Sequence, residues 1–241
     1  MGSAAHRLRG FAIMVLKKPK QGVVMDKRFI AILIAVVAVM IGVFALSGGK
    51  SGTSNATFEG DPTQVQADDW AQGPADAKVT LIEYGDFQCP GCAALFPALE
   101  QVKQELGNEF RFIFRHFPLT SIHPNAMAAH RAAEAAGLQG KFWEMHNQLY
   151  QTQQVWSGVS NAPELFEGYA QELGLDMDKY RTDIASQTVF DQISKFQDSG
   201  NQLGLTSTPS LLLNGEVIPN PATIDDLRQL IQSAIDATNG S

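Results

Sequence analysis

Apolar residues are distributed along this chain in three ways, and each way predicts a different kind of segment. Residues 29–46 form an unbroken apolar run without a charged side chain. Two shorter β-prone runs, at 78–84 and 110–117, flank a stretch in which apolar residues recur every three or four positions. Residues 124–205 show helical periodicity and no strand signal. The pattern therefore predicts an N-terminal apolar segment followed by an α/β domain with a helical insertion.

The apolar run is long enough to cross the hydrocarbon core of a bilayer as a helix. The preceding residues, 1–28, carry seven lysines and arginines against one acidic residue. Because basic flanks stay in the cytoplasm, we predict a basic cytoplasmic tail at 1–28, a transmembrane anchor at 29–47 and an extracytoplasmic remainder. A cleaved signal peptide ending near Ser47 is the alternative, but the run is longer than most signal sequences have. Met25 is a second candidate start.

Composition and charge change after the apolar run. Residues 48–73 are rich in glycine, serine and other polar residues, which predicts a flexible linker. The remainder, 74–241, has the size of one domain, and its helical insertion is placed at about 124–205. Beyond residue 50, acidic residues outnumber lysines and arginines by more than two to one. An acidic surface argues against nucleic acid as a partner and against docking on anionic lipid.

The only two cysteines, Cys89 and Cys92, stand where a predicted strand meets a predicted helix at 93–106. A cysteine at a helix N-terminus faces unpaired backbone N–H groups and the positive end of the helix dipole. Both favour the thiolate, which is the species that attacks a disulfide. Two cysteines one turn apart can also close into a small disulfide ring. The pattern therefore indicates a reversible redox pair.

Two other interpretations of the cysteine pair remain open. A purely structural disulfide would close a very small loop and so remove little entropy from the unfolded chain. A zinc site would need two more ligands, and the spacing of His116 and His123 matches no common zinc pattern. We therefore predict no metal site, and we interpret His130 and His146 as surface or packing residues.

Glu83 lies in the first predicted strand, six residues before Cys89. The alternation of this strand is too short to tell a buried side chain from a solvent-facing one. If buried, the carboxyl group would have a raised pKa and could carry protons to and from the second thiol.

Thr208 and Pro209 open a strand that Asn214-Gly215 turns into a hairpin. A proline at the start of such a strand indicates a special turn with a cis peptide bond. A capping box at Thr223 then predicts the start of a closing helix.

The order of these elements resembles the thioredoxin superfamily, and specifically the membrane-anchored bacterial DsbA-like thiol–disulfide oxidoreductases, over about residues 68–238. The motifs that carry the resemblance are Cys89-Pro90-Gly91-Cys92, Glu83, Pro97, Thr208-Pro209, Asp86-Phe87-Gln88 and Gly140-Lys141-Phe142-Trp143. The resemblance implies a thioredoxin-like α/β fold with a helical insertion, preceded by one N-terminal transmembrane helix.

For the site, the resemblance implies that Cys89 is the exposed nucleophile, Cys92 the resolving thiol and Glu83 a buried acid. Pro90 and Gly91 support the pair, which Thr208 and Pro209 face. Gly91 stands where the best-known strongly oxidising centre has a histidine, and Ser207 where many members have glycine. The missing histidine leaves the oxidising strength open.

The function implied is disulfide formation in exported cysteine-containing proteins, with a reductase or isomerase as the alternative. A non-enzymatic metal-binding or structural module is a weaker alternative. The resemblance implies no cofactor beyond a redox-active Cys89–Cys92 disulfide. It further implies a membrane redox partner of the quinone-reductase type and a single-pass location in the cell membrane.

Overall fold

The structure is a computed structural model that describes residues 27, 28, 30–32, 34, 36 and 58–240. The chain divides into two units, Met1–Thr53 and Ser54–Ser241, and the described residues of the first unit are helical. Most of the predicted tail and anchor, and the linker as far as residue 57, lie outside the described residues and stay predictions. Within the part of the chain that is described, no helix has the length and apolar character needed to span a membrane.

The second unit is built on a five-stranded sheet in the order β1-β3-β2-β4-β5. The strands are β1 (Trp70–Gln72), β2 (Val79–Gly85), β3 (Phe110–His116), β4 (Ser210–Leu213) and β5 (Glu216–Ile218). β2 and β3 pair in parallel, whereas the other neighbouring strands pair antiparallel. β2 and β3 are buried along almost their whole length, as is usual for strands covered on both faces.

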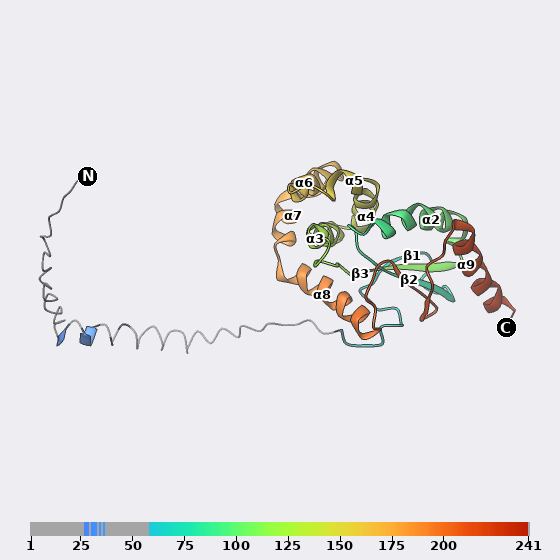
Figure 1. Cartoon of the computed structure of the whole chain (residues 1–241), viewed down its shortest axis with the longest axis horizontal. Helices are drawn as coiled ribbons and strands as arrows, with labels where there is room; N and C mark the ends of the chain where they lie inside the picture. The colour runs from blue at the N-terminus through green and yellow to red at the C-terminus, as the bar shows by residue number, and fades with distance from the viewer. Residues whose placement is uncertain (1–26, 29, 33, 35, 37–57, 241) are drawn as a thin grey trace, which may run out of the picture. The chain divides into compact units, whose positions relative to one another are not determined.

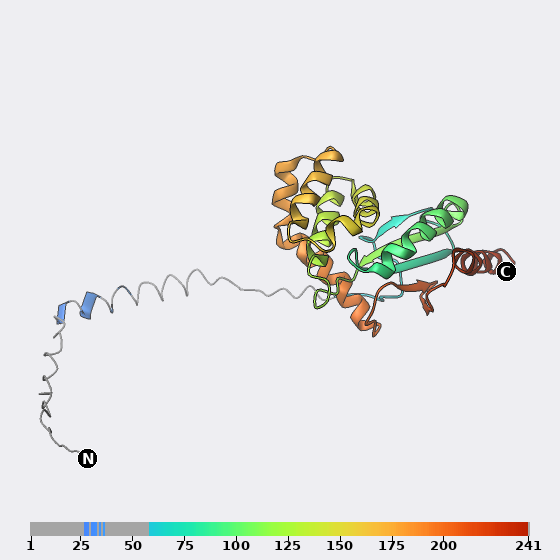
Figure 2. The same ribbon diagram turned by 45° about the horizontal axis from the view of Figure 1, so that its top comes forward.

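Helices cover this sheet and form the insertion. The helices are α2 (Pro90–Leu106), α3 (Ala126–Gly137), α4 (Phe142–Gln151), α5 (Gln153–Trp156), α6 (Ala162–Glu172), α7 (Met177–Ile184), α8 (Gln187–Gln202) and α9 (Ile224–Asn239). Helices α3 to α7 gather in one group beside the sheet, and α8 leads from that group back toward the strands (Figures 1 and 2). α2 links the two parallel strands and packs against α9.

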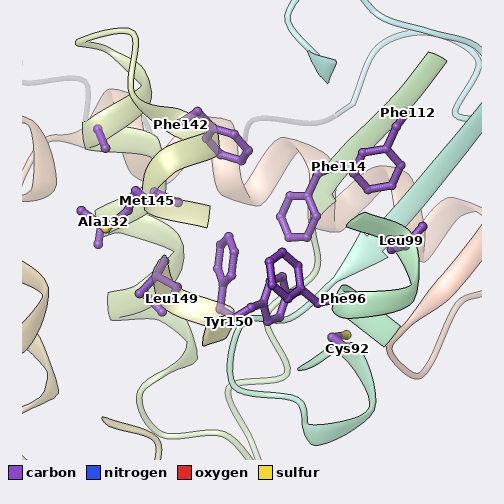
Figure 3. Packing of buried hydrophobic residues seen from close by; sticks show 14 of the residues in the cluster. Cys92, Phe96, Leu99, Phe112, Phe114, Ala132, Phe142, Met145, Leu149 and Tyr150 are labelled. Atoms are coloured by element: carbon purple, nitrogen blue, oxygen red, sulfur yellow. The ribbon is translucent and has the colours of Figure 1, made fainter. Parts of the chain in front are cut away.

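Alternation along β2 decides which face of the sheet each side chain meets. Leu81 belongs to the larger core cluster, whereas Ile82 and Tyr84 belong to a smaller one. In the larger cluster, aromatic rings from α2, β3 and α4 gather beside Cys92 (Figure 3). Glu83, two residues after Leu81, therefore shares the face that α2 covers.

The prediction of a flexible linker at 48–73 is wrong for its last sixteen residues, 58–73, which fold as part of the domain. β1 pairs with β3 at the edge of the sheet. Just before β1, Asp69 forms a buried ion pair with Arg115 of β3, with 2.8 Å between Oδ1 and Nε. A three-residue strand is too short to show alternation. The prediction therefore rested on the polar composition around this strand, which indicated a linker. The domain therefore begins before residue 74.

The helical insertion at 124–205 is confirmed, although the short helix α5 was not predicted. His130 and His146 were predicted to be surface or packing residues. Both are buried, so they are packing residues and not surface residues. Both stand on helices that pack on two sides, because the insertion is itself a small bundle. No local pattern showed that the polar positions of α3 and α4 would face other helices rather than water.

The C-terminal elements form as predicted. Asn214 and Gly215 have φ angles of 50° and 85°, and a type I′ hairpin turn requires positive φ at both positions. Thr223 and Asp226 complete the capping box that begins α9. The buried stripe of α9 consists of Leu227, Ile231 and Ile235.

Candidate active site

The chain turns sharply between β2 and α2, and this turn carries the first cysteine. The backbone N–H of Cys89 donates to the carbonyl of Asp86 at 3.0 Å, and the carbonyl of Cys89 accepts the N–H of Ala93 at 3.1 Å. Cys89 is thus the N-cap of α2, with Pro90 in the first helical position, where its missing N–H is not needed. As predicted, the nucleophile candidate stands at the N-terminus of a helix.

Both cysteines are free thiols in this structure. Cys89 is 8% exposed, while Cys92, one turn further along α2, is fully buried. The hydrogen bond from the Cys92 thiol is the largest cause that lowers the pKa of Cys89, to about 5. The backbone N–H groups of Cys92 and Gly91 lower this pKa further, against the opposing effect of burial. Cys89 is therefore a thiolate at neutral pH.

Cys92 has the opposite character. Burial raises its pKa well above the ordinary value, and so do its hydrogen bond to Cys89 and the nearby carboxyl group of Glu83. The backbone N–H of Asp86 lies 3.5 Å from the Cys92 sulfur and opposes this rise. The site therefore holds one ionised sulfur and one protonated sulfur.

Glu83 is 2% exposed, which agrees with the buried acid that the resemblance implied. Its Oε1 atom has no hydrogen-bond partner among the described residues. Burial raises the pKa of Glu83 to about 8, although the positive charge of Lys103 opposes the rise. The carboxyl group is thus neutral at pH 7 and can exchange a proton close to Cys92.

Lys103 is a residue of this site that the sequence analysis missed. Its ammonium group donates to Gln72 Oε1 at 2.8 Å and lies 4.8 Å from the centre of the Phe112 ring. A signal was available, because Lys103 follows Cys92 by eleven residues and so lies on the buried face of α2. A lysine on a buried helix face is rare and usually paired.

The strand β4 brings Thr208 and Pro209 against the cysteine pair. The Thr208–Pro209 peptide bond is cis, as predicted. The Cys89 sulfur lies 3.3 Å from the carbonyl oxygen of Thr208, to which it can donate only when it is protonated. A Cβ atom at Gly91 would lie 3.2 Å from Pro209 Cδ and 3.6 Å from the Cys89 sulfur. The lack of a side chain at Gly91 therefore lets Pro209 lie close to the first turn of α2.

A groove opens beside the pair, between α2 and the segment that leads into α9. Its volume is about 310 Å³. The residues that line it include Gly91, Leu95, Pro209, Pro221 and Ile224. Its mostly apolar walls and its position next to Pro209 suit an extended peptide.

Asp86 anchors a second group of buried polar side chains that the sequence analysis also missed. Its Oδ2 atom accepts from the backbone of Leu119 at 2.9 Å and contacts His123 Nδ1 at 2.7 Å. Burial opposes its ionisation, but a hydrogen bond and the charge of His130, together with hydrogen bonds from His123 and the Leu119 backbone, hold the pKa of Asp86 at about 2. The nearby His116 contacts His130 at 2.5 Å between their Nδ1 atoms. These contacts join α3 to the turn that precedes Cys89.

The histidines around Asp86 take their partners from one another and from buried carboxylates. Among the described residues, no three histidine, cysteine, aspartate or glutamate side chains gather in a way that could hold a metal ion. His116 bonds to His130 and to Glu134, His123 bonds to Asp86, and His130 Nε2 lies 3.8 Å from Asp86 Oδ1.

Comparison with known proteins gives relatives of two kinds. The chain is 32% identical over 243 residues to a protein named Na(+)/H(+) antiporter NhaA 1 from Salinispora arenicola, and 37% identical over 152 residues to one of the same name from Mycolicibacterium gilvum. These alignments cover 94% and 61% of this chain. The chain spans only 36% and 24% of the lengths of those two relatives.

Solved structures share the architecture. A thioredoxin-like oxidoreductase from Silicibacter pomeroyi has a TM-score of 0.61 at 24% identity, covering 76% of this chain and 99% of its own. Oxidised BdbD from Bacillus subtilis has a TM-score of 0.60 at 22% identity, covering 69% and 92%. Wolbachia pipientis alpha-DsbA1 has a TM-score of 0.63 at 19% identity, covering 72% and 94%. These likenesses show a thioredoxin-like fold.

The family described as Thioredoxin matches residues 66–233, which is well over half of the chain. The matched segment runs from just before β1 into α9 and includes the cysteine pair and the cis proline. The chain therefore belongs to the thioredoxin family.

Proposed function

We propose that this protein is a thiol–disulfide oxidoreductase that acts through Cys89 and Cys92, chiefly as an oxidase of exported proteins. The observation that carries the proposal is the unlike protonation of two thiols one turn apart: the pKa of Cys89 is lowered to about 5, and that of Cys92 is raised. An ionised, slightly exposed sulfur beside a buried, protonated one supports thiol–disulfide exchange. A stabilising disulfide would need neither feature.

In the oxidising direction, a substrate thiolate attacks the Cys89 sulfur of the Cys89–Cys92 disulfide. The bond between the two cysteines breaks, and Cys92 leaves with the electron pair and takes up a proton, for which neutral Glu83 is a nearby source. The substrate's second thiolate then attacks its own sulfur in the mixed disulfide, and Cys89 leaves as the stabilised thiolate. The substrate loses two electrons, and the protein ends as the dithiol.

The low pKa of Cys89 favours this direction. A stabilised thiolate stabilises the reduced protein relative to its disulfide, which makes the disulfide a stronger oxidant. It also makes Cys89 a good leaving group in the last step. The extended substrate would lie in the groove beside Pro209 and pair with the backbone there, as in strand addition.

The reduction potential tests this direction. We expect a value between about −270 mV, the potential of thioredoxin, and about −120 mV, that of DsbA, because the pKa of Cys89 lies between those of their nucleophiles. The measurement is equilibration with glutathione buffers, followed by quantification of the free thiols. A potential at or below that of thioredoxin would make the protein a reductase and overturn the proposed direction.

The antiporter names of the relatives do not change this proposal. This chain spans about a third or less of those proteins, and the function proposed here rests on its own cysteine site. An isomerase remains the second candidate, since the same pair could attack wrongly formed disulfides in its reduced form. Oxidation of a reduced test protein and rescue of a scrambled one separate the two activities.

The place of action is also a proposal. The apolar run at 29–46 and the basic residues before it support a single-pass anchor with the catalytic domain outside the cytoplasmic membrane. There the protein would need a membrane redox partner of the quinone-reductase type to restore its disulfide.

Topology follows from this proposal. Alkaline phosphatase fused after Ser241 should be active, because it requires export, and green fluorescent protein fused at the same position should be dark after export through the Sec pathway. The opposite pair of results would place the domain in the cytoplasm.

A further inference from the structure

A buried amide of the helical insertion binds the backbone of the turn that carries Cys89. Gln153, the first residue of α5, is 7% exposed. Its Nε2 group donates to the carbonyl of Phe87 at 2.7 Å and to the carbonyl of Cys89 at 2.9 Å. Both carbonyls belong to the segment between β2 and α2, so both N–H bonds of this amide bind the backbone of the active-site turn.

A second amide, on the turn itself, binds backbone groups outside the turn. Gln88 Oε1 accepts the backbone N–H of Asn125 at 2.6 Å, and Gln88 Nε2 donates to the carbonyl of Ser157 at 2.7 Å. Asn125 Nδ2 in turn donates to the carbonyl of Val159 at 2.9 Å. The turn and the α5 region are thus joined by a side chain from each: Gln88 from the turn and Gln153 from α5.

The carbonyl of Cys89 has two functions in this arrangement. It accepts the N–H of Ala93, the first hydrogen bond of α2, and it accepts from Gln153. The backbone N–H groups that face the Cys89 sulfur belong to Gly91 and Cys92, in that same first turn. The direction of this carbonyl therefore fixes the sulfur relative to its stabilising donors, and small displacements of such donors change reactivity strongly.

We propose that Gln153 is a positioning residue that sets the reactivity of Cys89 by holding the carbonyls of Phe87 and Cys89. It makes no contact with the sulfur itself, and it acts from the helical insertion rather than from the strand–helix core of the fold. The insertion would thus tune the redox pair. The redox part of this inference rests on the function proposed above, whereas the effect on Cys89 ionisation does not.

The test replaces Gln153 with methionine, which keeps the length of the side chain and removes both donors. Gln197→Met is the matched control, because Gln197 is also partly buried and donates one hydrogen bond, at 2.9 Å, to the carbonyl of Pro118. Two quantities are measured on the reduced full-length protein. They are the pH midpoint of iodoacetamide reaction at Cys89 and the equilibrium constant with glutathione.

In Q153M we expect the alkylation midpoint to rise and the glutathione equilibrium to shift about three- to tenfold toward the protein disulfide, the range that loss of one or two hydrogen bonds gives. Q197M should leave both at wild-type values. Gln153→Asn, which keeps the amide but is too short to reach both carbonyls, should shift both in the same direction. If folded Q153M or Q153N retains the wild-type midpoint, the inference is wrong, whatever its melting temperature.

The two failures are distinguishable. A wild-type protein that exchanges no disulfides would contradict the proposed function, yet the alkylation midpoint of Cys89 would still report on Gln153. A normal wild-type exchange rate with an unchanged Q153M midpoint would contradict only the role of Gln153.

Discussion

Replacement of Cys92 with alanine is expected to turn this protein into a trap for its substrates. Cys89 would still attack a substrate disulfide, but the resolving thiol would be missing, so the mixed disulfide would persist. Non-reducing electrophoresis of cells that produce C92A should show adducts that disappear on reduction. Turnover in a disulfide-exchange assay should fall by about a thousandfold or more, because a covalent step has no remaining nucleophile.

Cys89→Ala is the matched control, since it removes the other sulfur of the same pair. It should form no adducts, because Cys92 is fully buried and its pKa is raised. In the reduced wild-type protein at pH 7, alkylation should favour Cys89 over Cys92 by about a hundredfold, as expected when one thiol is ionised and the other is not. Adducts on C89A, or faster labelling of Cys92, would reverse the roles of the two cysteines.

The local part of this site could be predicted from the sequence. Cys89 and Cys92 follow an apolar strand and precede a helical pattern, so their place at the N-terminus of a helix needed only neighbouring residues. The Asn214-Gly215 hairpin is similarly local, because its turn chemistry is contained in two residues. The burial of Glu83 needed the resemblance, since one short strand does not reveal which of its faces is covered.

Other parts of the site depend on contacts between distant segments. Gln153 reaches the turn at 87–89 across more than sixty residues of sequence, and nothing in its neighbourhood marks it as different from the other glutamines of the insertion. Asp86 meets His130 and His123 only because α3 packs beside the end of β2. Polar residues buried by such packing are indistinguishable in sequence from residues on a solvated helix face.

The strand β1 shows a different limit. Trp70 stacks on Phe142 of the insertion with ring centroids 4.3 Å apart, and its Nε1 donates to Glu134 Oε1 at 2.8 Å. A tryptophan in a polar segment was therefore a usable signal of packing. The prediction of a flexible linker to residue 73 gave more weight to composition than to this one large side chain.

The absence of a side chain at position 91 bears on the oxidising strength. A histidine there would add a positive charge beside the thiolate, but Gly91 leaves the stabilisation to the Cys92 thiol and backbone donors. These groups still lower the pKa of Cys89 to about 5. The centre is therefore expected to be oxidising without the histidine, and weaker than centres that have it.

Glu83→Gln should make the reduced protein more stable in neutral and mildly alkaline solution while it slows disulfide exchange. The pKa of Glu83 is raised from 4.5 to about 8 in the folded protein, chiefly by burial. Between these pH values the folded state holds a proton that the unfolded state has lost, so this carboxyl group makes the wild-type free energy of unfolding fall as pH rises. This loss in the free energy of unfolding is absent below pH 4.5 and complete above about pH 8, where it reaches about 5 kcal/mol.

Urea unfolding of both proteins at pH 5, 7 and 8.5, with the thiols kept reduced, measures this difference. The advantage of E83Q over wild type should grow across the series, because glutamine has no proton to lose. Glu216→Gln, an exposed carboxyl-to-amide change on β5, should show no such growth. Over pH 6 to 8, E83Q should also exchange disulfides more slowly, since Cys92 would lack its nearby proton carrier. A constant stability difference from pH 5 to 8.5, together with wild-type exchange rates, would mean that Glu83 stays ionised in the fold and carries no proton for the pair.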